Sequence, residues 1–101
     1  MEMELSSKQR AYLRSLANDQ PPIVHIGKEG IGPNLIKQTW DALEARELIK
    51  IQVMKNAPYD TREACTLLCE KVHALPVQCI GSRFVIYRPA RKDPKIDLTN
   101  A

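Results

Sequence analysis

Apolar and polar positions along the chain predict three helices and four strands in the order α-β-α-β-α-β-β. Helical spacing of apolar residues identifies segments 7–17, 33–46 and 61–74, each preceded by a capping residue or begun by a proline. Short runs rich in β-branched residues identify strands at 23–26, 48–53, 77–80 and 84–87. Strands joined through helices are expected to be parallel, and the last two must form an antiparallel hairpin. The expected fold class is therefore α/β, with one mixed four-stranded sheet packed against helices.

The same pattern assigns the core. Strand 48–53 should turn its isoleucines and valine to one side and Lys50 and Gln52 to the other, as a half-buried strand does. The cysteines cannot all pair with one another and lack the spacing of a metal site, so we expect free thiols that serve packing. The residues expected to be buried in the helices are Tyr12, Leu13, Leu16, Ile31, Leu35, Ile36, Trp40, Leu43, Ala64, Leu67, Leu68 and Val72, and the cysteines are Cys65, Cys69 and Cys79.

Length and composition favour one domain. The 101 residues allow a single core, and we expect a domain at 1–89 followed by a polar, partly flexible basic tail at 90–101. No apolar run exceeds four residues, whereas a membrane helix needs about 20. The acidic segment 1–4 contains no apolar signal region, so the cytoplasm is the expected compartment.

The segment Gly27, Lys28, Glu29 and Gly30 lies between a predicted strand and a predicted helix. Glycines allow close approach of another backbone, and the helix start offers free N–H groups and the positive end of its dipole. Lys28 adds a cation, and together these groups could hold a phosphate. A tight turn that needs glycine only for its geometry is the competing interpretation, because the spacing matches neither a Walker A motif nor a dinucleotide fingerprint.

Charge is unevenly distributed. The net charge is only +3, but residues 81–95 alone carry +4. The basic residues there are Arg83, Arg88, Arg91, Lys92 and Lys95, and Lys8, Arg10 and Arg14 are expected on one face of the first helix. If these groups share a surface with Lys28, they form an electrostatic footprint for nucleic acid; the alternative is a solvated surface without function. Of the aromatic residues, Tyr59 in a loop could stack on a base.

Four ordered blocks of the sequence resemble the YhbY-type stand-alone CRM (chloroplast RNA splicing and ribosome maturation) domain. They are LSSKQR at 5–10, IGKEGI at 26–31, ALEARELIK at 42–50, and IG at 80–81 followed by YRP at 87–89. The resemblance covers residues 4–98. One departure is that Gly32 stands where many members place a threonine, which predicts a weaker cap for the second helix.

The resemblance implies an RNA-binding module without catalytic activity or cofactor, associated with ribosomal RNA of the large-subunit precursor. It implies a fold like the C-terminal domain of translation initiation factor three, and it places the RNA-contact loop at 27–30. We expect RNA contacts from Gly27, Lys28, Glu29, Gly30, Lys8, Arg10, Arg14, Arg83 and Arg88, in a monomer that binds no metal.

Two other function classes are considered. An enzyme would need convergent groups, and only His25 and His73 are available as imidazole bases. A pocket that contained His25 and a strongly perturbed acid would favour that class. A protein-interaction module would instead show an apolar patch on an uncovered sheet face.

Overall fold

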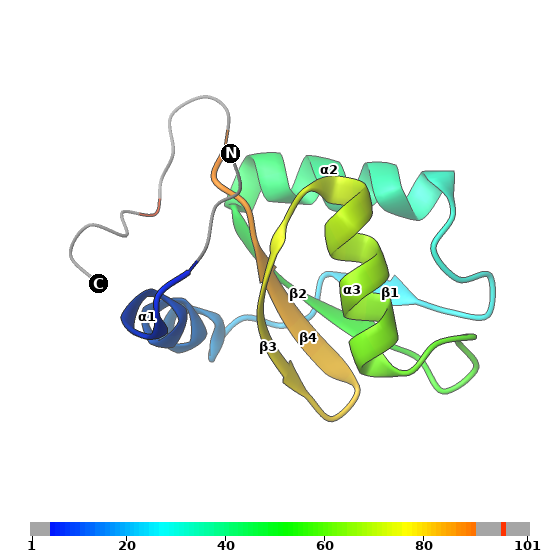
Figure 1. Cartoon of the computed structure of the whole chain (residues 1–101). Coiled ribbons are helices and arrows are strands. Elements are labelled where there is room, and N and C mark those ends of the chain that lie inside the picture. Colours follow the sequence, from blue (N-terminus) through cyan, green and yellow to red (C-terminus); the bar gives the residue numbers. More distant parts are fainter. Residues whose placement is uncertain (1–4, 91–95, 97–101) are drawn as a thin grey trace.

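The computed structural model describes residues 5–90 and residue 96, and it confirms the predicted order of elements (Figure 1). The helices are α1 (Ser7–Ala17), α2 (Pro33–Arg46) and α3 (Thr61–Val72), and the strands are β1 (Val24–Ile26), β2 (Leu48–Val53), β3 (Leu75–Ile80) and β4 (Arg83–Tyr87). Helix α3 ends earlier than predicted because His73 adopts a left-handed conformation with φ of 57°. Strand β3 begins earlier because Leu75 and Pro76 already pair with β4.

Local sequence explains where the helices begin. In α1 the Ser6 hydroxyl accepts the N–H of Gln9 at 3.1 Å, and Oε1 of Gln9 accepts the N–H of Ser6 at 3.0 Å. Asp60 and Glu63 form the same reciprocal pair at the start of α3. Helix α2 begins instead with Pro33, after a residue that supplies no side-chain hydrogen bond. All three predicted starts are present, but a side chain satisfies N–H groups at only two of them.

The sheet is mixed, with the strand order β1-β2-β4-β3. Strand β1 pairs with β2 in parallel, and β4 lies between β2 and β3 and runs antiparallel to both. Strands β2 and β3 therefore run in the same direction, as predicted for a helical crossover, although they are not neighbours. Strand β3 forms one edge and contains a bulge between Pro76 and Gln78, which suits a residue without an N–H to donate.

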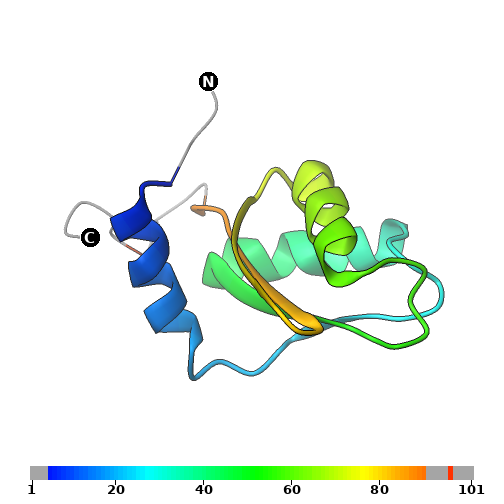
Figure 2. The same cartoon turned by 60° about the horizontal axis from the view of Figure 1, so that its bottom comes forward.

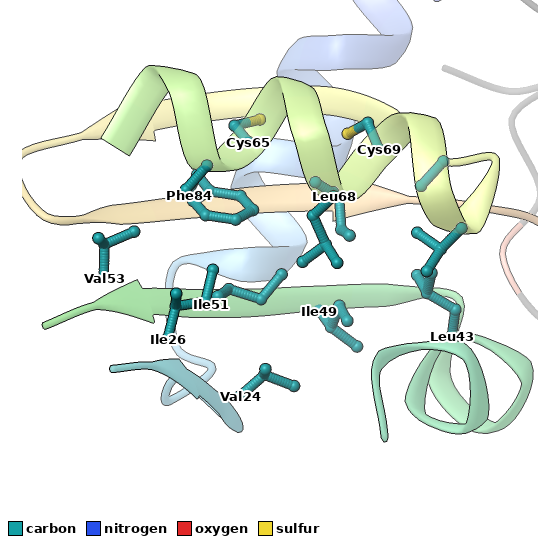
Figure 3. Packing of buried hydrophobic residues seen from close by; sticks show 14 residues of the cluster. Val24, Ile26, Leu43, Ile49, Ile51, Val53, Cys65, Leu68, Cys69 and Phe84 are labelled. Atoms are coloured by element: carbon teal, nitrogen blue, oxygen red, sulfur yellow. The ribbon is translucent and has the colours of Figure 1, made fainter. Parts of the chain in front are cut away.

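The two faces of the sheet are covered by different helices. Helices α2 and α3 pack on one face and α1 on the other (Figures 1 and 2). The main core lies under α2 and α3, where Ile51, Leu68 and Phe84 are buried together (Figure 3). The smaller core on the opposite face consists of Leu13, Ala17, Leu48, Val77, Val85 and Tyr87.

Three helix positions predicted to be buried are exposed. Tyr12 and Leu16 are 38% and 37% exposed, because α1 turns Leu13 and Ala17 toward the sheet. Leu13 and Ala17 stand four apart, so they lie on one side of the helix. Leu67 on α3 is 36% exposed, whereas its neighbour Leu68 is fully buried. The errors on α1 and on α3 have the same cause. The spacing of apolar residues shows that a helix is amphipathic, but it locates the centre of the buried side less accurately.

The cysteines are free, and two of the three are buried. Cys65 and Cys69 line the side of α3 that faces the sheet (Figure 3), but Cys79 on β3 is exposed and not a core residue. A hydrogen bond with Cys69, followed by burial, raises the pKa of Cys65, and burial of its thiol raises the pKa of Cys79 to about 11. The Cys65 and Cys79 thiols are therefore expected to be neutral at pH 7, which disfavours a role for either as a nucleophile.

The sequence predicts Arg88 on an exposed basic surface, but the structure buries its side chain to 8% exposure. Its Nη1 donates to the Val72 carbonyl at 2.9 Å, and its Nη2 donates to Oε1 of Glu44 at 2.7 Å. The guanidinium also lies over the Trp40 ring, 4.0 Å from its centroid. Arg88 therefore joins the end of β4 to α2 and α3.

Glu47, between α2 and β2, is a fully buried residue with φ of 66°. Its N–H donates to the Leu43 carbonyl, and its own carbonyl accepts the N–H of Arg88 at 2.9 Å. Its carboxylate accepts the N–H of Ala90 at 2.8 Å and that of Ile96 at 2.9 Å. Glu47 therefore attaches the chain beyond β4 to the domain at the two described residues of the predicted tail. The rest of that tail, residues 91–95 and 97–101 with Arg91, Lys92 and Lys95, lies outside the described residues.

Replacing the Glu47 carboxylate should destabilise the domain. Glu47→Gln keeps the size of the side chain but replaces one acceptor oxygen by an NH2 donor, so only one of the two N–H groups of Ala90 and Ile96 keeps its acceptor. We expect the free energy of unfolding to fall by about 1–3 kcal/mol, measured by urea denaturation. Glu70→Gln removes the same charge from an exposed position of α3, and it should change stability by less than about 0.5 kcal/mol. Equal effects of the two substitutions would contradict the role assigned to Glu47.

Candidate nucleic-acid interface

The segment 27–30 forms a tight turn at the end of β1. The Gly30 N–H donates to the Gly27 carbonyl at 3.0 Å, which closes the turn. Lys28 and Glu29 occupy its tip and are exposed. The preceding strand is held in place because the Met54 N–H donates to the Ile26 carbonyl at 2.9 Å. The turn is thus a projecting loop on a rigid base, with its two charged side chains in solvent.

The two glycines of the loop have different roles. Gly30 has φ of +72°, and a Cβ placed on it would lie 2.9 Å from Oη of Tyr59. A Cβ on Gly27 would meet nothing within 4 Å. Tyr59 packs partly buried against the main core, so its ring supports the loop from below. Gly30 is therefore required by conformation and by packing, whereas Gly27 leaves open space around the backbone.

The start of α2 beside the loop has no side-chain cap. Gly32 occupies the N-cap position without a side chain, and Pro33 has no N–H. The N–H groups of Asn34 and Leu35 therefore lack the side-chain acceptors found in α1 and α3. Uncapped N–H groups and the helix dipole make this end electropositive. The weaker cap expected from Gly32 is confirmed.

The loop and the helix start enclose a hollow of about 660 Å³. Its wall includes Lys28 and Glu29 of the loop, residues of α2, His25 of β1 and Asn56 of the segment after β2. One cation and one carboxylate lie there, so the hollow is not surrounded by acidic groups. Its other polar side chains are the amides of Asn34 and Gln38, which stand four apart and share one side of α2. This spacing was available in the sequence as a signal for the amide pair.

The other basic residues predicted to contact RNA do not gather at the loop. Arg83 lies at the start of β4, and Arg10 lines a separate hollow of about 440 Å³ with Arg62 near β3, at the opposite edge of the sheet from β1. Lys8, Arg10 and Arg14 do not form a single face. At 3.6 residues per turn, residues two apart differ by about 200°, so Lys8 points away from Arg10, whereas Arg14 follows Arg10 by about one turn.

Within the described residues, no group of three or more histidine, cysteine or acidic side chains could hold a metal ion. His25 is exposed on β1, and the only acidic side chain that lines the same hollow is the exposed Glu29. His73 caps α3, with its ring at 83° to the Trp40 ring and 6.2 Å away. The hollow at the loop thus presents amides, a cation and backbone N–H groups, which are suited to binding an anion.

No helix in the described part of the chain is long and apolar enough to cross a membrane.

Comparison with known proteins shows which family this chain is similar to. The model of the CRS1/YhbY (CRM) domain matches residues 5–88. The chain is 39% identical over 94 residues to a Bacillus subtilis protein named "Probable RNA-binding protein YqeI", covering 93% of this chain and 98% of that one. It is 34% identical over 95 residues to a Haemophilus influenzae protein named "RNA-binding protein", covering 93% and 94% of the two chains. These names describe RNA-binding proteins and not enzymes.

A solved structure shows the same fold. The solution structure of the hypothetical protein SAV1595 from Staphylococcus aureus matches with a TM-score of 0.77 and 47% sequence identity. The match covers 93% of this chain and 98% of that chain. The order of elements and the mixed sheet predicted from the sequence are thus found both in this structure and in that relative.

The different roles of the two loop glycines can be tested by measuring stability. Gly30→Ala forces a Cβ into a left-handed residue and against Tyr59, so we expect the free energy of unfolding to fall by about 1–3 kcal/mol. Gly27→Ala meets no neighbour and should change it by less than about 0.5 kcal/mol. Thermal and urea denaturation of both variants would check this. Equal stability of Gly30→Ala and the unmodified protein would show that Tyr59 does not restrict the loop.

Proposed function

Because the chain belongs to the CRS1/YhbY (CRM) domain family, we propose that it is a non-catalytic RNA-binding protein whose loop 27–30 holds the RNA backbone. The observation that carries this proposal is the hollow where Lys28 and the uncapped first turn of α2 meet. A ribose-phosphate chain needs hydrogen-bond donors and positive potential, and both converge there. The open space at Gly27 would let a backbone approach the loop closely.

Within this proposal the basic residues have unequal roles. Lys28 is the central cation, and Gly27, Gly30 and the exposed Glu29 shape the loop around it. Arg83, Arg10, Arg14 and Lys8 are outlying cations that raise the local concentration of RNA and extend the contact. The Arg88 guanidinium is engaged by Glu44 and Val72 inside the fold. Its contribution would therefore be to hold β4 in position.

The family resemblance points to ribosomal RNA of the large-subunit precursor as the RNA. We propose that the protein acts in assembly of that subunit, as a monomer and in the cytoplasm. A protein-interaction function has less support, because the large exposed apolar side chains among the described residues are distributed over several elements. They are Tyr12 and Leu16 on α1, Met54 after β2, Leu67 on α3 and Ile80 on β3.

Reversing the charge at position 28 should weaken RNA binding without unfolding the domain. Lys28→Glu removes one cation from the hollow and places a second carboxylate beside Glu29. We expect affinity for ribosomal RNA fragments to fall about tenfold or more at low salt, since hydrogen bonds to charged groups contribute about 1.5–3 kcal/mol. The slope of log affinity against log salt should become shallower by about 0.7–0.9. Filter binding at several salt concentrations measures both quantities.

Two further variants control for net charge. Lys71→Glu makes the same change at an exposed position of α3 that does not line the hollow, and it should leave most of the affinity intact. Glu29→Gln removes the carboxylate near the loop and should strengthen binding. If Lys28→Glu and Lys71→Glu reduced affinity equally, RNA binding would depend on overall charge and not on the loop.

Association with immature large subunits can be examined by sedimentation. In sucrose gradients of cell extracts, the unmodified protein should travel with precursors of the large subunit, and Lys28→Glu should shift toward the top of the gradient. The protein is detected by immunoblotting and the precursors by their unprocessed ribosomal RNA. Recovery of the unmodified protein only in ribosome-free fractions would refute the assembly role while leaving RNA binding open.

A further inference from the structure

Among the residues that the structure describes, α1 is the helix on the face of the sheet opposite α2 and α3, and it packs at one end of the strands (Figure 2). Neighbouring strands place their side chains in rows across the sheet, and the first row on this face, Leu48, Tyr87 and Leu75, belongs to the small core under α1. The rows further from α1 have a different character. Lys50, Val85 and Gln78 form the next row, where Val85 is still buried in the small core and its two neighbours are half-buried, and His25, Gln52, Arg83 and Ile80 form the last.

The last row is polar and accessible. His25 and Arg83 are exposed, Gln52 is half-buried, and Ile80 is 63% exposed, which is high for a large apolar side chain on a strand. The row crosses all four strands, so it spans about 14 Å at the usual spacing between strands. We call this row and the row of Lys50, Val85 and Gln78 the open end of the sheet.

The open end of the sheet carries positive charge. Lys50 and Arg83 are its two cations, and neither row contains a carboxylate. No ion pair within the described residues engages either cation. The two residues also line a hollow of about 140 Å³ with Gln78 and Ile80. An anionic partner is therefore favoured here over a basic or purely apolar surface.

The open end of the sheet is continuous with the loop. His25 lines the hollow at the loop 27–30, and it is also the first member of the outer row. A strand of RNA whose phosphates lie at Lys28 would therefore reach the open end of the sheet at β1.

We propose that the open end of the sheet contacts the bases of a single strand of RNA whose backbone is held at the loop. This inference rests on the proposed function, and it adds a second surface with a different task. The amide of Gln52 can donate and accept hydrogen bonds at base edges, and the flat groups of His25 and Arg83 can stack on bases. In duplex RNA the base edges of the major groove lie too deep for side chains to reach. The surface therefore suits unpaired nucleotides.

The two surfaces predict different behaviour in one experiment. Binding is measured for oligonucleotides of A, C or U of equal length and for an RNA duplex of equal charge, at fixed salt. We expect the unmodified protein to prefer single strands and to bind the best homopolymer at least about fivefold more tightly than the worst, since contacts to base edges discriminate between bases. Gln52→Leu and His25→Ala should reduce this ratio about threefold or more.

Comparison with Lys28→Glu separates this inference from the proposed function. Lys28→Glu should weaken binding to all oligonucleotides by a similar factor and leave the ratio unchanged. Gln52→Leu should leave the salt dependence unchanged, because the residue carries no charge. Circular dichroism and thermal denaturation establish that each variant is folded. His25→Ala serves as a second variant, because Gln52→Leu also removes the hydrogen bond that Gln52 donates to Ser82. Thr66→Val, on α3 over the opposite face of the sheet, should change neither the ratio nor the salt dependence.

The possible results are distinct. A reduced ratio in Gln52→Leu and His25→Ala supports base contacts at the open end of the sheet. An unchanged ratio in both variants, with weaker binding by Lys28→Glu, overturns the inference and leaves the proposed function standing. Preference of the unmodified protein for the duplex, or no discrimination among the homopolymers, also overturns it. Unchanged binding in Lys28→Glu as well as in the sheet variants would count against both proposals.

Discussion

The insertion of β4 between β2 and β3 is the constraint on which the rest of the structure depends. It makes β2 and β4 the central strands, and side chains that alternate along them must serve two faces at once. On one face Ile49, Ile51 and Phe84 form a continuous apolar layer under α2 and α3. On the other face Leu48 and Tyr87 contact α1, but Gln52 and Arg83, at the opposite ends of the same two strands, are polar. One helix is enough to cover the apolar half, and the polar half is left open.

The polar groups of the domain follow a related division. Glu47 and Arg88 are charged residues inside the fold, and both connect elements that are distant in the sequence. Buried charges are tolerated when hydrogen bonds compensate for the loss of water, and those contacts make their positions sensitive to change. Lys28, in contrast, is exposed at the tip of a turn. Charged residues thus stabilise the fold at the end of β4, whereas at the end of β1 Lys28 is the cation that the proposed function assigns to RNA binding.

The loop 27–30 depends on packing as well as on its own sequence. Its shape requires Gly30 in a left-handed conformation, and the space that would hold a side chain there is filled by Tyr59 from the segment before α3. Tyr59, whose ring could stack on a base by its sequence position, packs partly against the core instead. A support of this kind fixes the backbone of the loop relative to the start of α2. Recognition of a backbone benefits from such a fixed arrangement, because less conformational freedom is lost on binding.

The sequence by itself determined the order of elements, two capping boxes and the turn at 27–30, because these depend on residues close together along the chain. It also indicated a mixed sheet, because strands joined through a helix are almost always parallel and a short hairpin must be antiparallel. It also identified the family, since four motifs in order are a specific pattern. Only the tertiary structure decided that Arg88 is internal and that Cys79 and Leu67 are exposed. The register that brings His25, Gln52 and Arg83 into one row was likewise settled by pairing between strands far apart in sequence. Burial and proximity depend on contacts between distant segments, and periodicity within one segment contains no information about which partner will cover it.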